Sequence, residues 1–335
     1  MLRLGVIGCG KVTTMFHLKA IEDVEGVSVV AVTDPDESRM LEVKARAGAE
    51  RGYLDHLELL SDPDVDAVAV NAPPRFHEAM VVEALRAGKH VLCEKPLARS
   101  VEGCLHVKEV QGYTGLTVMP VHNYAFTPCL ESARAVVEGG EIGEVRVMEL
   151  HFNNNLRSYG SKTDFRLVED LGIVEDLLPH VLSVIHIMTG GGLTLESARG
   201  WKRSFGVVDN LSLGLENGGI PVECSMNWTS LIPAFKVKVE GDGGSLSMDL
   251  MKFPHRVSVR GSNGGRVIDK KGLGKYLDLL RIRHPAFREQ YAHFVDVVER
   301  RRGASFTLDD EVEMLSLMVG VREALSETDI TEDSR

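Results

Sequence analysis

A glycine-rich turn directly after the first apolar run indicates which class of fold this chain adopts. Residues 2–7 form a near-continuous apolar run, and the stretch 8–13 (GCGKVT) follows before a segment with helical spacing. Glycines permit a tight turn and let backbone amides approach a phosphate at the positive end of the following helix. The motif therefore predicts a strand, turn and helix that bind a dinucleotide pyrophosphate, with contacts from Gly8, Gly10, Lys11 and Val12. Thr13 replaces the usual third glycine, which implies a slightly wider spacing between helix and strand.

Apolar runs and helix-length segments alternate along the first third of the chain. The runs lie at 2–7, 27–32, 65–71, 90–93 and 116–121, and segments of 3.6-residue spacing lie at 15–22, 38–47 and 77–87. Strands of a parallel sheet read as continuous apolar runs, because helices cover both faces. We therefore expect an α/β fold whose residues 1–122 form a Rossmann domain with a doubly wound parallel sheet.

The pattern changes near residue 123. Strand-like segments now dominate, at 144–152, 195–201, 210–216, 222–228, 235–240 and 256–260, with helices at 130–138, 174–188, 285–300 and 308–326. Several strands alternate apolar with polar residues, which is typical of an antiparallel sheet with one solvated face. Residues 123–335 are predicted to form an α+β domain with a large, mostly antiparallel open sheet. A chain of 335 residues is long enough for two such cores.

An acidic residue ends the second apolar run. Asp34 lies about 20 residues after the glycine turn, where a carboxylate can accept hydrogen bonds from ribose hydroxyls and repel a 2′-phosphate. This position favours NAD over NADP, and we count Arg39 among the cofactor contacts. An alternative stays open, since Asp34-Pro35-Asp36 could be a simple turn and helix cap.

Charge and cysteine content narrow the class of partner. The net charge is −11, whereas nucleic-acid binding depends on Lys and Arg, so no nucleic-acid partner is expected. Five widely separated cysteines contain no C-x-x-C pair and are typical of reduced, buried thiols. No leader pattern and no apolar run of about 20 residues are seen, so we expect a cytoplasmic protein without membrane insertion.

Three further stretches give the chain a family resemblance: 71–77 (NAPPRFH), 87–96 (AGKHVLCEKP) and 176–180 (DLLPH). Together they resemble the Gfo/Idh/MocA oxidoreductases. The resemblance implies that Asn71, Ala72, Pro73 and His77 line the cofactor groove, that Glu94 and Lys95 lie near the nicotinamide, and that the Lys95–Pro96 bond is cis. It also implies a homodimer or homotetramer formed through the C-terminal sheet.

The chemistry of the same residues is consistent with this reading. A lysine at the carboxyl end of a parallel strand points toward the ligand crevice, where Lys95 could hydrogen-bond a substrate oxygen. Asp176 and His180 are four residues apart in an expected helix, so the imidazole could take a hydroxyl proton while the carboxylate orients the substrate. These three are the predicted catalytic residues. As alternatives, Glu94 and Lys95 could merely cap a strand at the surface, and His180 could be an ordinary helical histidine. Asp176 and His180 could supply two ligands to a metal ion, but no third ligand is evident, so no metal site is expected.

Two departures from the family pattern concern the substrate. Ser183 stands where a second Asp is common, and Ala125 where an Arg is common, so the substrate could differ from the usual inositols and hexoses. His122, Asn123 and Tyr124 could contact substrate or simply pack beneath a hinge. Arg157, with Lys162 and Arg166, could recognise a carboxylate or phosphate, although a solvated loop is the alternative.

The resemblance and these residues together favour an NAD(P)-dependent dehydrogenase that acts on a secondary hydroxyl or ketone of a sugar, cyclitol or related polyol. Two alternatives remain open. Some relatives hydrolyse or epimerise glycosides with a retained cofactor, and others are non-catalytic sensors that bind NAD.

Overall fold

The computed structural model describes residues 1–159, 172–261, 264–269, 283–326 and 331–332. It forms two compact units. The first holds Met1–Asn123 and a later stretch that contains helix α10 (Pro285–Val298) and ends at Val312; the second holds the rest of the described chain. The predicted contiguous division at residue 123 therefore differs from the observed units, because α10 packs within the first unit.

The first unit is built on a parallel sheet of six strands in the order β3-β2-β1-β4-β5-β6. This is the expected Rossmann arrangement, in which the chain starts in the middle and winds outward in both directions. The strands are β1 (Leu2–Ile7), β2 (Val27–Thr33), β3 (Arg51–Tyr53), β4 (Ala67–Val70), β5 (His90–Cys93) and β6 (Val118–Pro120). The helices are α1 (Leu18–Ile21), α2 (Glu37–Ala47), α3 (His56–Leu60), α4 (His77–Arg86) and α5 (Val101–Thr114), with α10.

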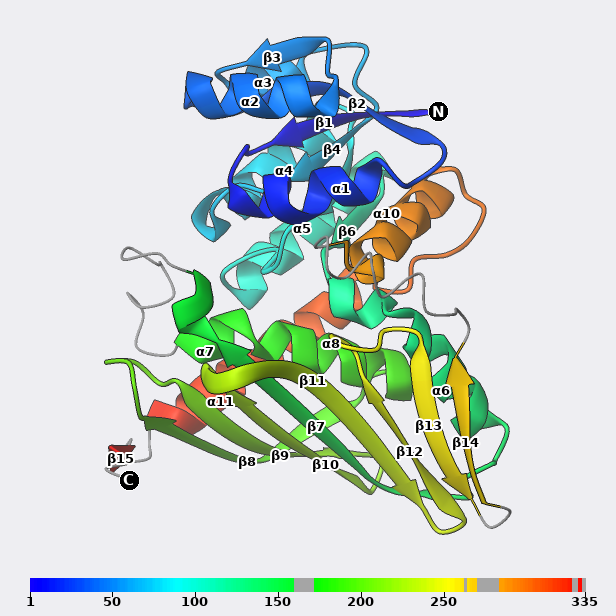
Figure 1. Ribbon diagram of the computed structural model, residues 1–335. Helices are drawn as coiled ribbons and strands as arrows, with labels where there is room; N and C mark the ends of the chain where they lie inside the picture. The colour runs from blue at the N-terminus through cyan, green and yellow to red at the C-terminus, as the bar shows by residue number, and fades with distance from the viewer. Residues whose placement is uncertain (160–171, 262–263, 270–282, 327–330, 333–335) are drawn as a thin grey trace. The chain divides into compact units, whose positions relative to one another are not determined.

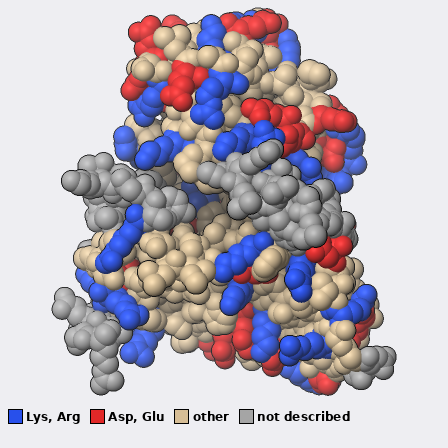
Figure 2. All heavy atoms as spheres, in the orientation of Figure 1, with Lys and Arg blue, Asp and Glu red and all other residues tan. Residues whose placement is uncertain are grey.

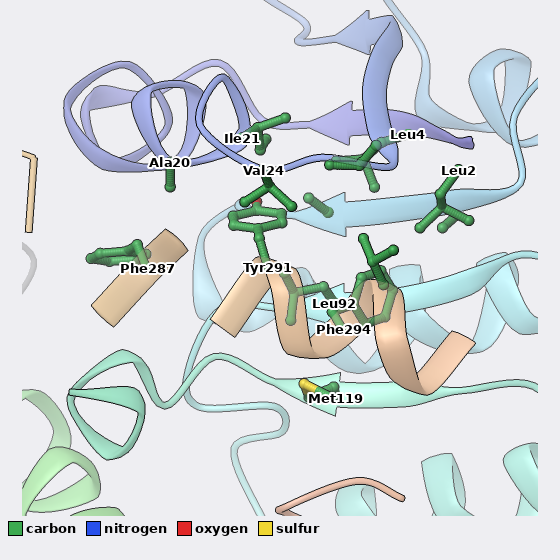
Figure 3. Packing of buried hydrophobic residues seen from close by; sticks show 14 of the residues in the cluster. Leu2, Leu4, Ala20, Ile21, Val24, Leu92, Met119, Phe287, Tyr291 and Phe294 are labelled. Atoms are coloured by element: carbon green, nitrogen blue, oxygen red, sulfur yellow. The ribbon is translucent and has the colours of Figure 1, made fainter. Parts of the chain in front are cut away.

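Helix α10 completes the core of the first unit. Phe287, Tyr291 and Phe294 are at most 9% exposed and belong to one apolar cluster with residues of β1, α1, β5 and β6. Figure 3 shows Tyr291 rising from α10 toward Val24 and Ile21. An amphipathic helix buries its apolar stripe against a core, and α10 buries its stripe against the sheet of the first unit.

The second unit contains a sheet of nine strands in the order β14-β13-β12-β11-β7-β10-β9-β8-β15. Strand β7 pairs in parallel with β10, as does β8 with β15, and the other neighbours are antiparallel, so the predicted mostly antiparallel sheet is confirmed. The strands are β7 (Val145–Asn155), β8 (Leu193–Lys202), β9 (Asn210–Asn217), β10 (Ile220–Asn227), β11 (Thr229–Gly241), β12 (Gly244–Asp249), β13 (Arg256–Gly261), β14 (Gly264–Asp269) and β15 (Thr331–Glu332).

Helices cover one face of this sheet, as Figure 1 shows. They are α6 (Pro128–Glu138), α7 (Gly172–Asp176), α8 (Leu178–Thr189) and α11 (Leu308–Ser326). On β7 the side chains of Met148, Leu150 and Phe152 are buried under the helices, and His151 is exposed on the opposite face. This alternation is the period-two pattern that the sequence indicated.

The expected single helix over 174–188 is wrong, because the chain turns at Leu177 between α7 and α8. Pro179 lies in the first turn of α8, where its missing N–H costs nothing, and a proline in this place ends the preceding helix. Asp176 therefore ends one helix and His180 begins the next, so their spacing does not place them on one continuous helical face.

The described helices include none long and apolar enough to cross a membrane. On the face drawn in Figure 2, acidic and basic side chains are interspersed over each unit. The expectation that nucleic acid is no partner stays a prediction.

Candidate functional site

The glycine turn after β1 has one position that the protein itself requires and one that it leaves open. Gly8 has a φ of +97°, and a Cβ there would lie 2.8 Å from the backbone carbon and oxygen of Asn71. A Cβ on Gly10 would meet no atom within 4 Å. Gly8 is therefore needed for the fold, whereas the space beside Gly10 suits a closely approaching ligand such as a pyrophosphate.

Thr13 fills the position of the third glycine with a hydrogen-bonded side chain. Its hydroxyl donates to the Gly8 carbonyl at 2.7 Å and accepts from the Asn71 amide at 3.1 Å. Thr13 begins a π-helical turn, Thr13–His17, that continues into α1. Lys11 and Val12 precede this turn, with Lys11 exposed. The departure from glycine is thus compensated by bonds that join the turn to the end of β4.

Asp34 lies at the carboxyl end of β2, beside the glycine turn. One carboxylate oxygen accepts from the Cys9 backbone N–H at 2.8 Å, and the other accepts from Asp36 N–H at 2.9 Å. Arg39 is exposed and lies 3.4 Å from Asp34. Asp36 caps α2, so the turn-and-cap reading also describes this segment. Burial, with the Asp34 charge, raises the pKa of the Cys9 thiol to about 12, which keeps the thiol protonated.

The segment after β4 is held by a buried histidine. His77 is 1% exposed, its Nδ1 lies 2.7 Å from the Pro96 carbonyl, and its Nε2 lies 2.7 Å from the Ala72 carbonyl. Both partners only accept, so each nitrogen must donate for both bonds to form. His77 thus joins the Ala72-Pro73 turn to the segment that carries Lys95.

The Glu94-Lys95-Pro96 segment follows β5, and its Lys95–Pro96 bond is cis, as expected. The Glu94 side chain is only 13% exposed, and it accepts from His17 Nε2 at 2.9 Å. Burial would raise the pKa of Glu94, but the His17 hydrogen bond and the nearby positive charges outweigh it and lower that pKa. Lys95 is half-buried beside this carboxylate. Sequence reasoning missed His17 and its partner Tyr291, because no local motif marks either residue.

In the second unit, Asp176 is held by a buried tryptophan. The indole N–H of Trp228, which is fully buried, donates to Asp176 Oδ2 at 3.2 Å. The neighbouring Glu175 pairs with Arg322 of α11. Sequence reasoning gave no role to Trp228, although a buried indole normally needs an acceptor.

His180 lies in the first turn of α8 among aromatic rings. The Tyr124 ring meets it edge-on, with centroids 5.1 Å apart, and Phe152 lies 6.0 Å away. The two residues that depart from the family pattern, Ser183 and Ala125, are both buried. The Ser183 hydroxyl donates to the His180 carbonyl within α8, and Ala125 has an apolar side chain. Tyr124 and His180 are therefore neighbours.

Two other predicted substrate residues lie in different surroundings. His122 is 1% exposed and contacts Glu311 at 2.7 Å, and Asn123 is 6% exposed; this burial favours the packing alternative for both. Arg157 is exposed, with its guanidinium 5.9 Å from the Phe205 ring. Lys162 and Arg166 lie outside the described residues. Among the residues that are described, no group of three His, Cys, Asp or Glu side chains could hold a metal ion.

Comparisons with known proteins agree over both units. A family model described as an oxidoreductase family with an NAD-binding Rossmann fold matches residues 2–122, and the Gfo/Idh/MocA C-terminal domain model matches residues 130–247. The scyllo-inositol 2-dehydrogenase (NAD⁺) of Bacillus subtilis is 24% identical, with 96% of this chain and 92% of that protein covered. The chain spans about half the length, 44–57%, of several curated relatives that it matches at 30% identity or more.

Solved structures share the fold over 97–98% of this chain. An oxidoreductase from Agrobacterium radiobacter in complex with NAD⁺, L-tartaric acid and magnesium has a TM-score of 0.84 at 23% identity, with 98% of each chain covered. A 3-ketoreductase from Actinomadura kijaniata in complex with NADP and TDP-benzene has a TM-score of 0.82 at 22% identity, with 97% of this chain and 98% of that chain covered. The two family models together match well over half of the sequence, and the chain belongs to the Gfo/Idh/MocA oxidoreductase family.

Proposed function

We propose that this protein is an NAD(P)-dependent dehydrogenase that transfers a hydride between the nicotinamide and a secondary hydroxyl or ketone of a sugar, cyclitol or related polyol. The observation that carries the proposal is the anchored Lys95 segment at the carboxyl end of β5 in a Rossmann sheet whose glycine turn has space for a pyrophosphate. Ligands of such sheets bind at the carboxyl ends of the strands.

Each predicted residue named below has a role in this proposal. Gly8, Gly10, Lys11 and Val12 hold the pyrophosphate, and the turn of Asn71, Ala72, Pro73 and His77 lines the groove with Glu94. The bound nicotinamide supplies the hydride acceptor or donor.

Lys95 hydrogen-bonds the reacting oxygen of the substrate, His180 takes or returns its proton, and Asp176 orients a neighbouring hydroxyl. Tyr124 packs on His180, and Arg157 is the candidate contact for an acidic group.

NAD is the preferred cofactor in this proposal. The Asp34 carboxylate is fixed by the Cys9 amide, and a negative charge there disfavours a 2′-phosphate. Arg39 is the residue that would attract such a phosphate, but in the fold it faces Asp34 and Asp36. Replacing Asp34 by Ala should lower the ratio of kcat/KM for NAD over NADP by about tenfold or more; an unchanged ratio would remove this assignment.

A polyol substrate is supported by the carboxylate and imidazole of Asp176 and His180, which suit neighbouring hydroxyls, and by the name of the Bacillus subtilis relative. The test is the absorbance of reduced nicotinamide while the protein and NAD are mixed with cyclitols, aldoses, sugar acids and amino sugars. Replacing Lys95 by Met should lower turnover about 10²- to 10⁴-fold and leave NAD affinity nearly unchanged. Retained turnover in this variant would contradict the role of Lys95.

If no tested alcohol changes the absorbance of reduced nicotinamide while NAD stays bound, the result would instead favour hydrolysis or epimerisation with a retained cofactor, or a non-catalytic sensor that binds NAD. A homodimer or homotetramer formed through the open sheet face, and a cytoplasmic location, remain predictions. Light scattering of the wild type, and of a variant with Lys238 replaced by Glu on that face, would test the assembly.

A further inference from the structure

A buried chain of hydrogen bonds links the Lys95 segment to helix α10. The Tyr291 hydroxyl lies 2.8 Å from Nδ1 of His17, and Nε2 of the same ring lies 2.9 Å from Oε1 of Glu94. The other Glu94 oxygen accepts from the backbone N–H of Lys95 at 3.1 Å. His17 is fully buried and Tyr291 is 1% exposed. Three direct hydrogen bonds therefore link α10 to the main chain of Lys95.

Aromatic packing fixes the His17 ring in this chain. His17 is the last residue of the π-helical turn after the glycine motif. The Phe287 ring lies 5.1 Å from it at an interplanar angle of 68°, and the Tyr291 ring lies 5.7 Å from it at 90°. Phe287 and Tyr291 both belong to α10, and Figure 3 labels both side chains. Rotation of the imidazole would break this packing, so both nitrogens keep their partners.

The two ends of the chain have complementary chemistry. The Glu94 carboxylate only accepts, so Nε2 of His17 carries a hydrogen. The Tyr291 hydroxyl can donate to Nδ1 when the ring is neutral and accept from it when the ring is charged. Burial raises the pKa of Tyr291 well above its usual value, with the Glu94 charge adding to the effect, so the hydroxyl keeps its proton. The chain tolerates either charge state of His17.

A second anchor lies on the other side of Lys95. The Pro96 carbonyl is held by His77, which also binds the Ala72 carbonyl. Lys95 thus lies between two segments that buried histidines hold, one through the Glu94 side chain and one through the Pro96 carbonyl. Only the first of these anchors depends on α10.

We propose that Tyr291 and His17 are positioning residues that fix the Glu94 carboxylate and, through it, the main chain and electrostatic surroundings of Lys95. The inference rests on the proposed role of Lys95 in proton handling. Among the described residues, the titratable groups that bond to His17 are Glu94 and Tyr291, and the charged or titratable groups around Glu94 include Lys95 and His77. A change at Tyr291 should therefore alter the rate and its pH dependence more than the binding of NAD.

The test compares Tyr291→Phe, which keeps the ring and removes the hydroxyl, with Val295→Ala on the same helix. Val295 is 1% exposed in the same apolar cluster but makes none of these hydrogen bonds. Its variant therefore loosens the packing of α10 and leaves the bonds of Tyr291, His17 and Glu94 in place. For Tyr291→Phe we expect kcat to fall about tenfold, the value of one hydrogen bond. KM for NAD should change less than twofold, and the pH profile of kcat should shift. Val295→Ala should lower Tm and leave kcat and its profile unchanged.

Hydrogen exchange provides a readout that needs no substrate. The peptide covering residues 90–97 should exchange faster in Tyr291→Phe than in the wild type or in Val295→Ala. His17→Gln, whose amide can both donate to Glu94 and accept from Tyr291, should exchange more slowly in this peptide than His17→Leu.

Two results would overturn the inference. One is a Tyr291→Phe variant whose kcat, pH profile and hydrogen exchange equal those of the wild type. The other is a Val295→Ala variant that shows the changes in kcat, pH profile and exchange expected of Tyr291→Phe. If the wild type oxidises no polyol, the proposed function fails, and the exchange comparison still decides whether Tyr291 positions the Lys95 segment. Turnover retained after replacing Lys95 by Met would remove the role of Lys95 alone.

Discussion

The proposed cofactor residues and the proposed substrate residues of this protein are held by different kinds of contact. In the first unit several anchors end on main-chain atoms: Gly8 lies against the backbone of Asn71, His77 bridges two carbonyls, and the Glu94 side chain accepts from the N–H of Lys95. In the second unit the anchors are side chains, since Asp176 rests on the Trp228 indole and His180 on the Tyr124 ring. A backbone anchor admits few alternatives, whereas one substitution can reshape a side-chain pocket. The first arrangement suits an invariant cofactor and the second suits a variable substrate.

The largest effect should come from the glycine turn. Gly8→Ala introduces a Cβ at a φ of +97° and 2.8 Å from backbone atoms of Asn71, so we expect destabilisation of about 3 kcal/mol and loss of NAD binding. Gly10→Ala is the matched control, because its Cβ meets nothing within 4 Å. It should leave Tm unchanged and weaken NAD binding about tenfold or more. Thermal unfolding and NAD titration measure both effects, and tight NAD binding by Gly10→Ala would contradict the assignment of this turn.

A smaller effect is expected on the side-chain-anchored half. Trp228→Phe removes the N–H that holds Asp176, so kcat/KM for the alcohol should fall about tenfold while NAD affinity stays the same. The chain offers a matched control in its other tryptophan, Trp201, which is only partly buried in β8. Trp201→Phe should keep kcat/KM near the wild-type value. Equal losses in both variants would mean that Trp228 acts through general stability.

Acid should weaken the first unit through a buried histidine of α10. Burial, with Arg302 nearby, lowers the pKa of His293 on α10 to about 4, below the value near 6.5 of an unfolded histidine. The unfolded chain therefore binds the proton first, so the stability that neutral His293 contributes is complete above about pH 6.5 and lost as the pH falls toward about 4. We expect a loss on the order of 1 kcal/mol from pH 7 to pH 5 in denaturant titrations. His293→Gln should show a flatter dependence, and an equal slope in both proteins would refute the assignment.

The smallest effect is expected at Arg157. Its exposed guanidinium lies 5.9 Å from the Phe205 ring, a contact worth about 0.5–1 kcal/mol. Arg157→Ala should raise KM about two- to fivefold for a substrate with a carboxylate and leave KM for a neutral polyol unchanged. Unchanged KM for both classes would assign Arg157 to the solvated surface.

Periodicity and turn chemistry made most of the fold predictable. Helix 308–326 and strands 2–7 and 90–93 have the bounds that the pattern indicates. Strand β14 was missed because its sequence begins with two glycines and most of its residues are exposed, so neither alternation nor an apolar run marks it. The break at Leu177 was missed because the apolar spacing continues past Pro179, although the proline itself was a usable signal.

The candidate site was predictable where local motifs carry it and obscure where distant residues meet. Gly8, Asp34 and Lys95 follow from strand ends and short motifs. The pairing of His17 with Tyr291 joins residues 274 apart in sequence, and that of His122 with Glu311 joins residues 189 apart. No local pattern encodes such pairs, because they depend on how α10 and α11 pack against residues far away in the sequence.

The discontinuous first unit affects how this protein is made. During synthesis, the six-stranded sheet is complete by β6, yet the helix that packs with Leu4, Leu92 and Met119 is complete only when the chain has reached residue 298. Until then the side chains of this cluster lack their contacts with α10, and the strands of the second unit from β7 to β14 must be synthesised in the meantime. An enzyme assembled by exchanging halves of two relatives must therefore take α10 from the same parent as the glycine turn.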